Sequence, residues 1–412
     1  MMKKRQLILA SAFTGALIGA GATSAAADTG KLQESDLELL LAEQHALNVE
    51  TAIKSIDDHP AAQAAEEALL QNTEQLESYL AGLLYQPEEA RELTEFFRQQ
   101  SEWITAAADG QTGEAPTAEG LGYRSQTAAE SYAATLQNLI GHYAEEDFES
   151  AYRAHLEGFS AIESLSTAWS DSLTDEFPKH FDGNPESADE LRSTWNRLGA
   201  EHIALSQLSM AKGFDGDSDF DFVEWAQDEN AESFRALFAE YYGEEQSDRF
   251  LELWTNDHLL VQGDLSAAAV AGDEDGQTDA AAALSADFPA AFGSFLVELT
   301  EHPDAASAQQ AIERHETAAV EAFEHYQQED FEAYYTSYGE GFGAIGEFSE
   351  HFTNATAERF PEQFTNAAPE KMPATGLGGM ASGNAILGLW IALSTVIIGL
   401  GATFTLRQRK PE

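Results

Sequence analysis

One stretch of this sequence occurs twice, and it constrains the fold more than any other feature. The copies cover residues 147–181 and 330–364, and each ends at a Phe-Pro pair. Within each copy, apolar and aromatic residues recur at alternating steps of four and three: Phe148, Tyr152, His155, Phe159 and Ile162, then Phe331, Tyr335, Tyr338, Phe342 and Ile345. This spacing predicts a long helix that buries one broad stripe, and the proline disfavours its continuation.

The repeat extends over most of the chain. Before the long helix, corresponding residues such as Glu43 and Glu201 differ by 158 positions, whereas Asp147 and Asp330 differ by 183. The second copy therefore carries 183 − 158 = 25 extra residues, which fall where residues 278–299 form an additional amphipathic helix. We predict five helices in residues 28–183 and six in residues 184–366, each half with a core like that of a four-helix bundle.

The predicted fold class is all-α, because no stretch alternates with a period of two. In the first half we expect helices over residues 31–58, 61–85, 87–108 and 127–143, followed by the repeated helix. The apolar residues of the first helix predict one buried face, formed by Leu37, Leu40, Leu41, Leu47 and Ile53.

The charge of the chain limits its partners. The formal net charge is −51, and without the basic residues at the two termini and Glu412 it is 15 − 71 = −56. Such a body repels nucleic acid and anionic lipid, and adaptation to high salt is the simplest explanation for it. With 43% hydrophobic residues the chain has enough apolar side chains for a packed core. The lack of cysteine excludes disulfides and thiolate metal sites.

Residues 1–27 have the features of a secretory signal peptide. Lys3-Lys4-Arg5 precede an apolar run, and Ala25-Ala26-Ala27 precede Asp28 as small residues do at a cleavage site. An uncleaved membrane anchor is the alternative, although the apolar run is short for one.

The C-terminal tail has three ordered parts. Residues 367–384 form a polar linker that contains Met372-Pro373-Ala374-Thr375-Gly376, residues 385–406 form an uncharged apolar span, and residues 407–412 are a basic tail expected on the cytoplasmic side. This order resembles the LPXTG-type sorting signal of surface proteins of Gram-positive bacteria, with Met372 where leucine is usual. The resemblance implies that a sortase cuts after Thr375 and joins it to peptidoglycan. A simple membrane anchor is the alternative.

Four histidines of the second half are candidate ligands of a metal ion or a haem. His202, His258, His315 and His325 lie on different predicted helices of the second half, and imidazoles from several helices are a usual way to build such a site in a bundle. The first half aligns Gln44, Gln100 and Tyr132 with the first three, so only His325 has a histidine counterpart, His142. Ordinary structural histidines are the alternative. Neither Glu-x-x-His nor His-Glu-x-x-His occurs.

Other motifs give weaker signals. Residues 215–221 alternate acids as calcium loops do, but Phe220 and Ala226 stand where an EF-hand needs glycine and glutamate; residues 273–276 are similar and shorter. The G-x-G-x-x-G of residues 341–346 lies inside the predicted long helix, so we interpret its glycines as packing residues. No nucleophile elbow or phosphate loop occurs.

The sequence therefore predicts a wall-anchored, non-enzymatic, all-α surface protein. Its expected role is binding or spacing at the cell surface, because two copies of a weak binding module gain avidity. Its expected partners are sortase, peptidoglycan and, before sorting, the membrane, while the extracellular ligand stays open. The alternative is a metal- or haem-binding bundle that uses the histidines of the second half.

Overall fold

The computed structural model describes residues 34–84, 87–108, 110, 115–116, 123–176, 187–301 and 305–364. All regular secondary structure in these ranges is helical, which confirms the all-α fold class. The chain divides into two units, residues 1–366 and 367–412, and every described residue belongs to the first. The predicted signal peptide, the sorting motif at residues 372–376 and the apolar span of residues 385–406 lie outside the described residues.

The described part of the first half contains five helices, as predicted. They are α2 (Glu34–Ile56), α3 (Ala62–Leu84), α4 (Pro87–Ala108), α5 (Tyr123–Ala144) and α6 (Phe148–Glu176). Helix α5 begins four residues before the predicted start at residue 127. The reason is tertiary, since the Ser125 hydroxyl donates to the backbone oxygen of Ala168 on α6 at 3.0 Å and holds the extra turn.

The described part of the second half contains six long helical segments and one short helix. The segments are α7 (Ser187–Asp215), α8 (Phe220–Tyr242), α9–η1–α10 (Glu244–Trp254, Thr255–Leu259, Leu260–Ala271), α11–η2–α12 (Glu274–Ala282, Ala283–Asp287, Phe288–Thr300), α13 (Ala305–Gln327) and α14 (Phe331–Arg359), followed by α15 (Pro361–Phe364). The additional helix predicted at residues 278–299 is therefore confirmed as part of α11–η2–α12. The labels η1 and η2 denote single π-helical turns.

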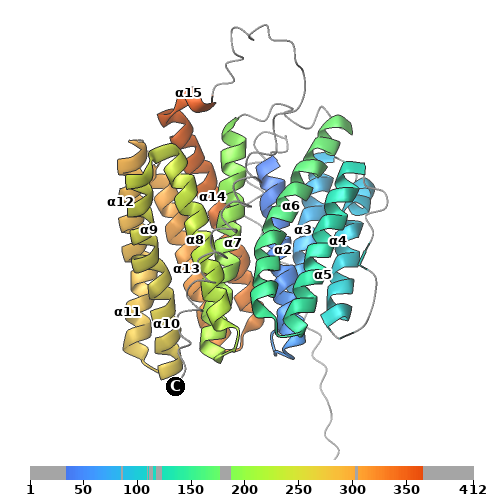
Figure 1. Ribbon diagram of the computed structural model, residues 1–412, viewed down its shortest axis with the longest axis horizontal. Helices are drawn as coiled ribbons and strands as arrows, with labels where there is room; N and C mark the ends of the chain where they lie inside the picture. Colours follow the sequence, from blue (N-terminus) through green and yellow to red (C-terminus); the bar gives the residue numbers. More distant parts are fainter. Residues whose placement is uncertain are drawn as a thin grey trace, which may run out of the picture. The chain divides into compact units, whose positions relative to one another are not determined.

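The two halves pack with reciprocal contacts around a central pair of helices. Figure 1 shows α2 and α7 side by side, with α3–α6 beyond α2 and α8–α14 beyond α7. Helix α6 packs on α2 and also contacts α8, while its counterpart α14 packs on α7 and also contacts α3. Each half thus repeats the other's contacts, as the two subunits of an isologous dimer do.

Helix α2 is buried on all sides, which the sequence did not predict. Its apolar face is buried as expected, from Leu37 to Ile53. The polar side chains on its other faces are buried too: Gln44, His45, Asn48, Glu50 and Lys54. The cause is that α3, α4, α6 and α7 surround α2, so it has no face left for solvent.

The apolar cores of the two halves interpenetrate. Leu39 and Leu47 of α2 and Phe159 of α6 belong to the core built mainly by the second half. Leu205 and Val223 of the second half belong in turn to the core built mainly by the first. The four-helix core that the sequence predicted for each half is therefore completed by side chains of the other.

One described segment passes the length and hydropathy requirements for a membrane span. It is the continuous run Glu274–Thr300, and 44% of its most apolar window is buried inside the fold. Phe288, Phe292 and Leu296 of this run are core residues, so its apolar character is explained by packing.

Candidate functional site

Three of the four predicted histidines meet inside the second half. His202 comes from α7, His258 from the π turn η1 and His315 from α13, and all three are almost completely buried. The Nε2 atoms of His202 and His258 are 2.9 Å apart. The ring centroids of His202 and His315 are 5.8 Å apart. We call these three residues the histidine cluster.

A buried carboxylate that the sequence did not single out joins the histidine cluster. Oε1 of Glu316 lies 3.4 Å from Nδ1 of His258 and 3.9 Å from Nε2 of His315, and both distances exceed those of ordinary hydrogen bonds. The other oxygen of Glu316 has no hydrogen-bond partner. Gln262, one turn after His258, donates from Nε2 to His258 Nε2 at 3.2 Å. Their positions in the sequence could have indicated both residues, because Glu316 directly follows His315 and Gln262 lies four residues after His258.

The π turn η1 helps to place the imidazole of His258. A π turn adds a residue to one helical turn, and such insertions occur frequently at functional sites. Opposite it, the second π turn η2 leads directly into Phe288, whose ring stacks on His258 with centroids 4.5 Å apart. Trp254 lies 4.7 Å from the rings of both His202 and His258. The histidine cluster is thus enclosed by aromatic rings.

The electrostatics of the site keep the imidazoles neutral. Burial lowers the pKa of His315 to about 4, and a contact with the backbone of Gly341 opposes this only in part. Burial, together with the neighbouring imidazoles, also holds the pKa values of His202 and His258 well below their usual range. Neutral imidazole is the form that binds metal ions. Burial raises the pKa of Glu316, so its carboxyl group is protonated when the site holds no cation.

His325 does not belong to the histidine cluster, contrary to the prediction. It lies ten residues after His315 on the same helix, which corresponds to about 15 Å along the axis. It sits in the last turn of α13, where its backbone oxygen accepts a hydrogen bond from the N–H of Asp330. The sequence predicted different helices for His315 and His325, but the structure places both on α13, and the helical rise separates them.

The corresponding place in the first half holds a hydrogen-bond network around Tyr132. Tyr132 stands where the second half has His315, and its hydroxyl lies 3.1 Å from Nδ1 of His45 and 2.9 Å from Nδ2 of Asn48. Asn48 also donates to Gln100 at 3.2 Å. The Tyr132 hydroxyl therefore has two partners, whereas neither ring nitrogen of His315 makes a hydrogen bond of ordinary geometry. Buried polar atoms without a partner remain in the first half too, at Nε2 of Gln100 and at both ring nitrogens of His155, but the second half differs in bringing three imidazoles and a carboxyl group together.

The donor set suits a metal ion, but the side chains are not yet arranged around one. Within the described ranges, no three His, Asp or Glu side chains surround a common point as metal ligands do. The Nε2 atoms of His202 and His258 form a hydrogen bond of 2.9 Å, and this separation also fits two ligands of one ion. An ion there requires the side chains of His315 and Glu316 to move inward.

A second buried polar feature links the two halves, and the sequence did not reveal it. Lys54 and Lys212 occupy corresponding positions, and each donates to a tyrosine of the other half: Lys54 to Tyr326 at 2.9 Å and Lys212 to Tyr143 at 2.8 Å. Nζ of Lys212 also lies 3.0 Å from Asp219. The signal was present, since each of these pairs keeps the repeat spacing of 158 or 183 positions.

The two acidic segments considered for calcium have other roles in the structure. Asp217 and Asp219 turn toward the ammonium group of Lys212, whereas Asp215 accepts a hydrogen bond from Tyr326. In the second segment, Asp273 caps α11 by accepting from the N–H of Gly276 at 3.1 Å. The carboxylates of Asp215, Asp217, Asp219 and Asp273 are therefore engaged by protein donors.

Comparisons with protein families, with curated proteins and with solved structures find no match for this chain. No residue role is therefore transferred from another protein. The geometry of the histidine cluster and the order of motifs in the sequence carry the functional argument.

Proposed function

We propose that this chain is a cell-surface protein whose helical body binds a transition-metal ion at His202, His258 and His315, with Glu316 as a further ligand. The observation that carries the proposal is the meeting of three neutral, buried imidazoles and a buried carboxyl group whose donor atoms are incompletely hydrogen-bonded. Buried polar groups are normally satisfied, so a group of this kind indicates a missing partner. The loss of a proton from Glu316 would supply the negative charge that an incoming cation favours.

The spacing of the two closest nitrogens favours some ions over others. Two nitrogens bound to one ion at about 2.05 Å are about 2.9 Å apart at a right angle and about 3.3 Å apart at the tetrahedral angle. The separation of Nε2 of His202 from Nε2 of His258 is 2.9 Å. A right angle belongs to square-planar and octahedral centres, so copper(II) or nickel(II) would replace the hydrogen-bonded proton between the two rings with the least movement, and the proposal favours these ions over zinc.

Haem is less well supported than a single ion. In the cavity that borders His202, the volume accessible to the centre of a water-sized sphere is about 20 Å³. Ligand pockets for molecules of haem's class are typically about 300 Å³ or larger. Aromatic rings already occupy the space around the histidine cluster.

The proposed location rests on the sequence alone. The signal peptide of residues 1–27 and the ordered tail of residues 367–412 support export and anchoring through Thr375 to peptidoglycan. The acidic body would be fully hydrated outside the membrane, which is compatible with this location. The expected binding or spacing role at the surface is the second candidate function, and the duplicated body with its acidic exterior favours it.

Metal titration tests the first candidate. Protein released from the cell wall is stripped with a chelator, and binding of Cu²⁺, Ni²⁺ and Zn²⁺ is followed by calorimetry and metal analysis. We expect one ion per chain, with copper(II) or nickel(II) tighter than zinc. His202→Gln and His258→Gln introduce the residue types that the first half has at Gln44 and Gln100, and each should weaken binding at least about 100-fold.

His325→Gln is the matched control for that experiment and should leave the affinity unchanged. Wild-type protein without a stoichiometric ion would contradict the metal proposal, as would equal affinities in all three variants. Mass spectrometry of wall-extracted protein tests the location separately. The mature chain should end at Thr375, and peptides that contain Arg409 in all of the mature protein would count against sorting.

A further inference from the structure

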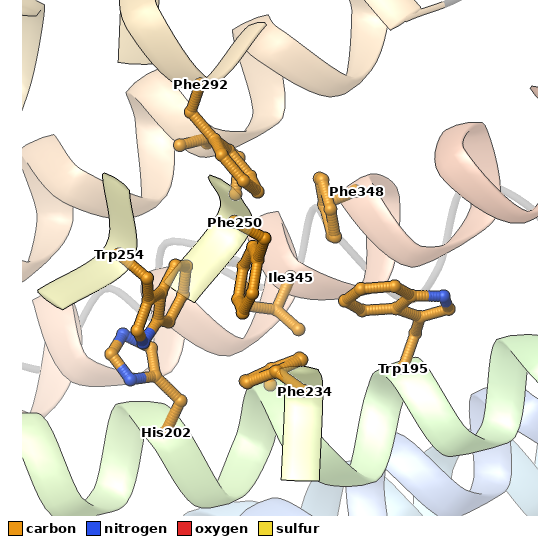
Figure 2. A pocket seen from close by; sticks show the side chains of 10 residues that line it. Trp195, His202, Phe234, Phe250, Trp254, Phe292, Ile345 and Phe348 are labelled. Atoms are coloured by element: carbon orange, nitrogen blue, oxygen red, sulfur yellow. The ribbon is translucent and has the colours of Figure 1, made fainter. Parts of the chain in front are cut away.

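A small cavity lies beside the histidine cluster. Its wall is formed by side chains from α7, α8, α9, α12, α13 and α14, and His202 is the lining residue that it shares with the histidine cluster. Figure 2 shows His202 and Trp195 rising from the same helix at opposite sides of the cavity, with Phe250 and Ile345 between them. The cavity therefore adjoins the imidazole that would hold an ion.

The cavity has room for a molecule but few partners for water. The space open to the centre of a water-sized sphere is about 20 Å³, and one water needs about 10–15 Å³. A buried water also needs two to four polar partners, whereas the wall here is almost entirely carbon. Figure 2 shows the benzo edge of Trp195, and not its indole nitrogen, directed toward the cavity. Such a space suits a small apolar molecule.

The first half supplies an internal comparison. Gly199 lines the cavity in the second half, and the corresponding residue in the first half is Leu41, which is completely buried. A Cβ atom added at Gly199 would lie 2.4 Å from Cγ2 of Ile345, so any side chain there would press Ile345 into the cavity. The half that has the histidine cluster thus has a glycine at this position, while the half that lacks it has a leucine.

We infer that this cavity takes up a small apolar diatomic molecule, of which dioxygen is the representative, and holds it against the imidazole of His202. The occupancy follows from the size and the carbon wall of the cavity. The chemical use of the molecule, as a ligand delivered to an ion at the histidine cluster, rests on the proposed function. The inference adds the class of small molecule that the site would meet.

Dioxygen itself is the probe for this inference. It is paramagnetic, so a dissolved molecule in the cavity speeds the nuclear relaxation of nearby methyl groups. The full chain is labelled at isoleucine methyl groups and measured with and without several bar of dioxygen. We expect the dioxygen-induced increase in methyl relaxation rate at Ile345 and Ile312 to be at least roughly three times that at Ile162. Ile162 is the matched control, because it occupies the position of Ile345 in the first half and is also buried.

Two variants test the cavity from opposite directions. Gly199→Ala should abolish the enhancement at Ile312, because the new methyl group drives Ile345 into the space. Ile345→Val removes one methylene group and should increase the enhancement at Ile312. Equal enhancement at Ile312 and Ile162 in the wild type would overturn the inference. If Gly199→Ala does not fold, an unchanged enhancement at Ile312 in Ile345→Val overturns it as well.

The result is independent of the metal titration. Relaxation is measured on metal-free protein and again after addition of Zn²⁺, which is diamagnetic. If the protein shows selective relaxation enhancement at Ile312 and Ile345 but binds no ion, the gas cavity is supported and the proposed metal function is refuted. If the protein binds an ion but shows no selective relaxation enhancement, the metal function is supported and the gas cavity is refuted.

Discussion

Replacing either of the two corresponding buried lysines with methionine should have very different consequences. Lys212 lies among three carboxylates, with Nζ 3.0 Å from Asp219, 3.0 Å from Asp217 and 3.4 Å from Asp57. Lys54 has Tyr326 as its hydrogen-bond partner and, among the described residues, no carboxylate within ion-pair distance. The repeat thus provides the same substitution in two electrostatic settings.

The direction of each lysine's pKa reports this difference. Burial lowers the pKa of Lys212, but the surrounding carboxylates, with Asp219 foremost, together outweigh burial and the net shift is upward. Burial also lowers the pKa of Lys54, and there the more distant charge of Glu50 compensates only in part. The folded protein therefore stabilises the charge of Lys212 and destabilises that of Lys54.

The expected magnitude for Lys212→Met comes mainly from Asp219. The Asp219 side chain is 2% exposed, whereas Asp57 and Asp217 are 35% and 36% exposed and are screened by solvent. Removing one partner of a buried pair costs about 3–5 kcal/mol because the other charge stays buried. The hydroxyl of Tyr152 still donates to Asp219 at 2.9 Å, so we expect the lower end, about 3 kcal/mol.

Lys54→Met should change the free energy of unfolding by less than about 1 kcal/mol, because an apolar residue of similar volume replaces a poorly paired charge. Urea unfolding followed by circular dichroism and tryptophan fluorescence measures both variants. The difference should persist in 1 M salt, because buried pairs are screened little. Equal losses in the two variants, or a loss below about 1 kcal/mol for Lys212→Met, would refute the reasoning.

Two further predictions use a pair of corresponding glycines and the partly buried Glu43. A Cβ atom at Gly158 would lie 2.2 Å from Cε1 of His45, so Gly158→Ala should lower the free energy of unfolding by about 1–3 kcal/mol. At the corresponding Gly341, an added Cβ atom would lie 3.7 Å from Nδ1 of His315, so Gly341→Ala should be neutral or stabilising in the same urea assay. A larger loss of stability in Gly341→Ala than in Gly158→Ala would contradict the packing. Burial raises the pKa of Glu43 to about 7. Between about pH 4.5 and 7 the folded protein therefore keeps a proton that the unfolded chain releases. The free energy of unfolding falls as the pH rises through this range. Glu43→Gln should therefore stabilise the protein at pH 8 by about 1–3 kcal/mol but not at pH 4, and urea midpoints that respond equally at both pH values would exclude this assignment.

The candidate site was only partly predictable. The sequence identified His202, His258 and His315 because they lie on different predicted helices and imidazoles from several helices commonly build metal sites in bundles. It did not identify Glu316, since acidic residues are so frequent here that no single one stands out. It included His325 wrongly, because membership of a site depends on the height along the helix as well as on the residue type.

The sequence by itself determined the all-α class, the repeat, the additional helix of the second half and most helix ends. These are local properties, since the period of the apolar residues and the prolines act within a few turns. Only the tertiary structure decided that α2 is buried on every side, that each buried lysine reaches a tyrosine of the other half, and that three histidines meet beside a cavity. Those outcomes depend on which helices become neighbours and on their rotation and height, which no local pattern of residues specifies.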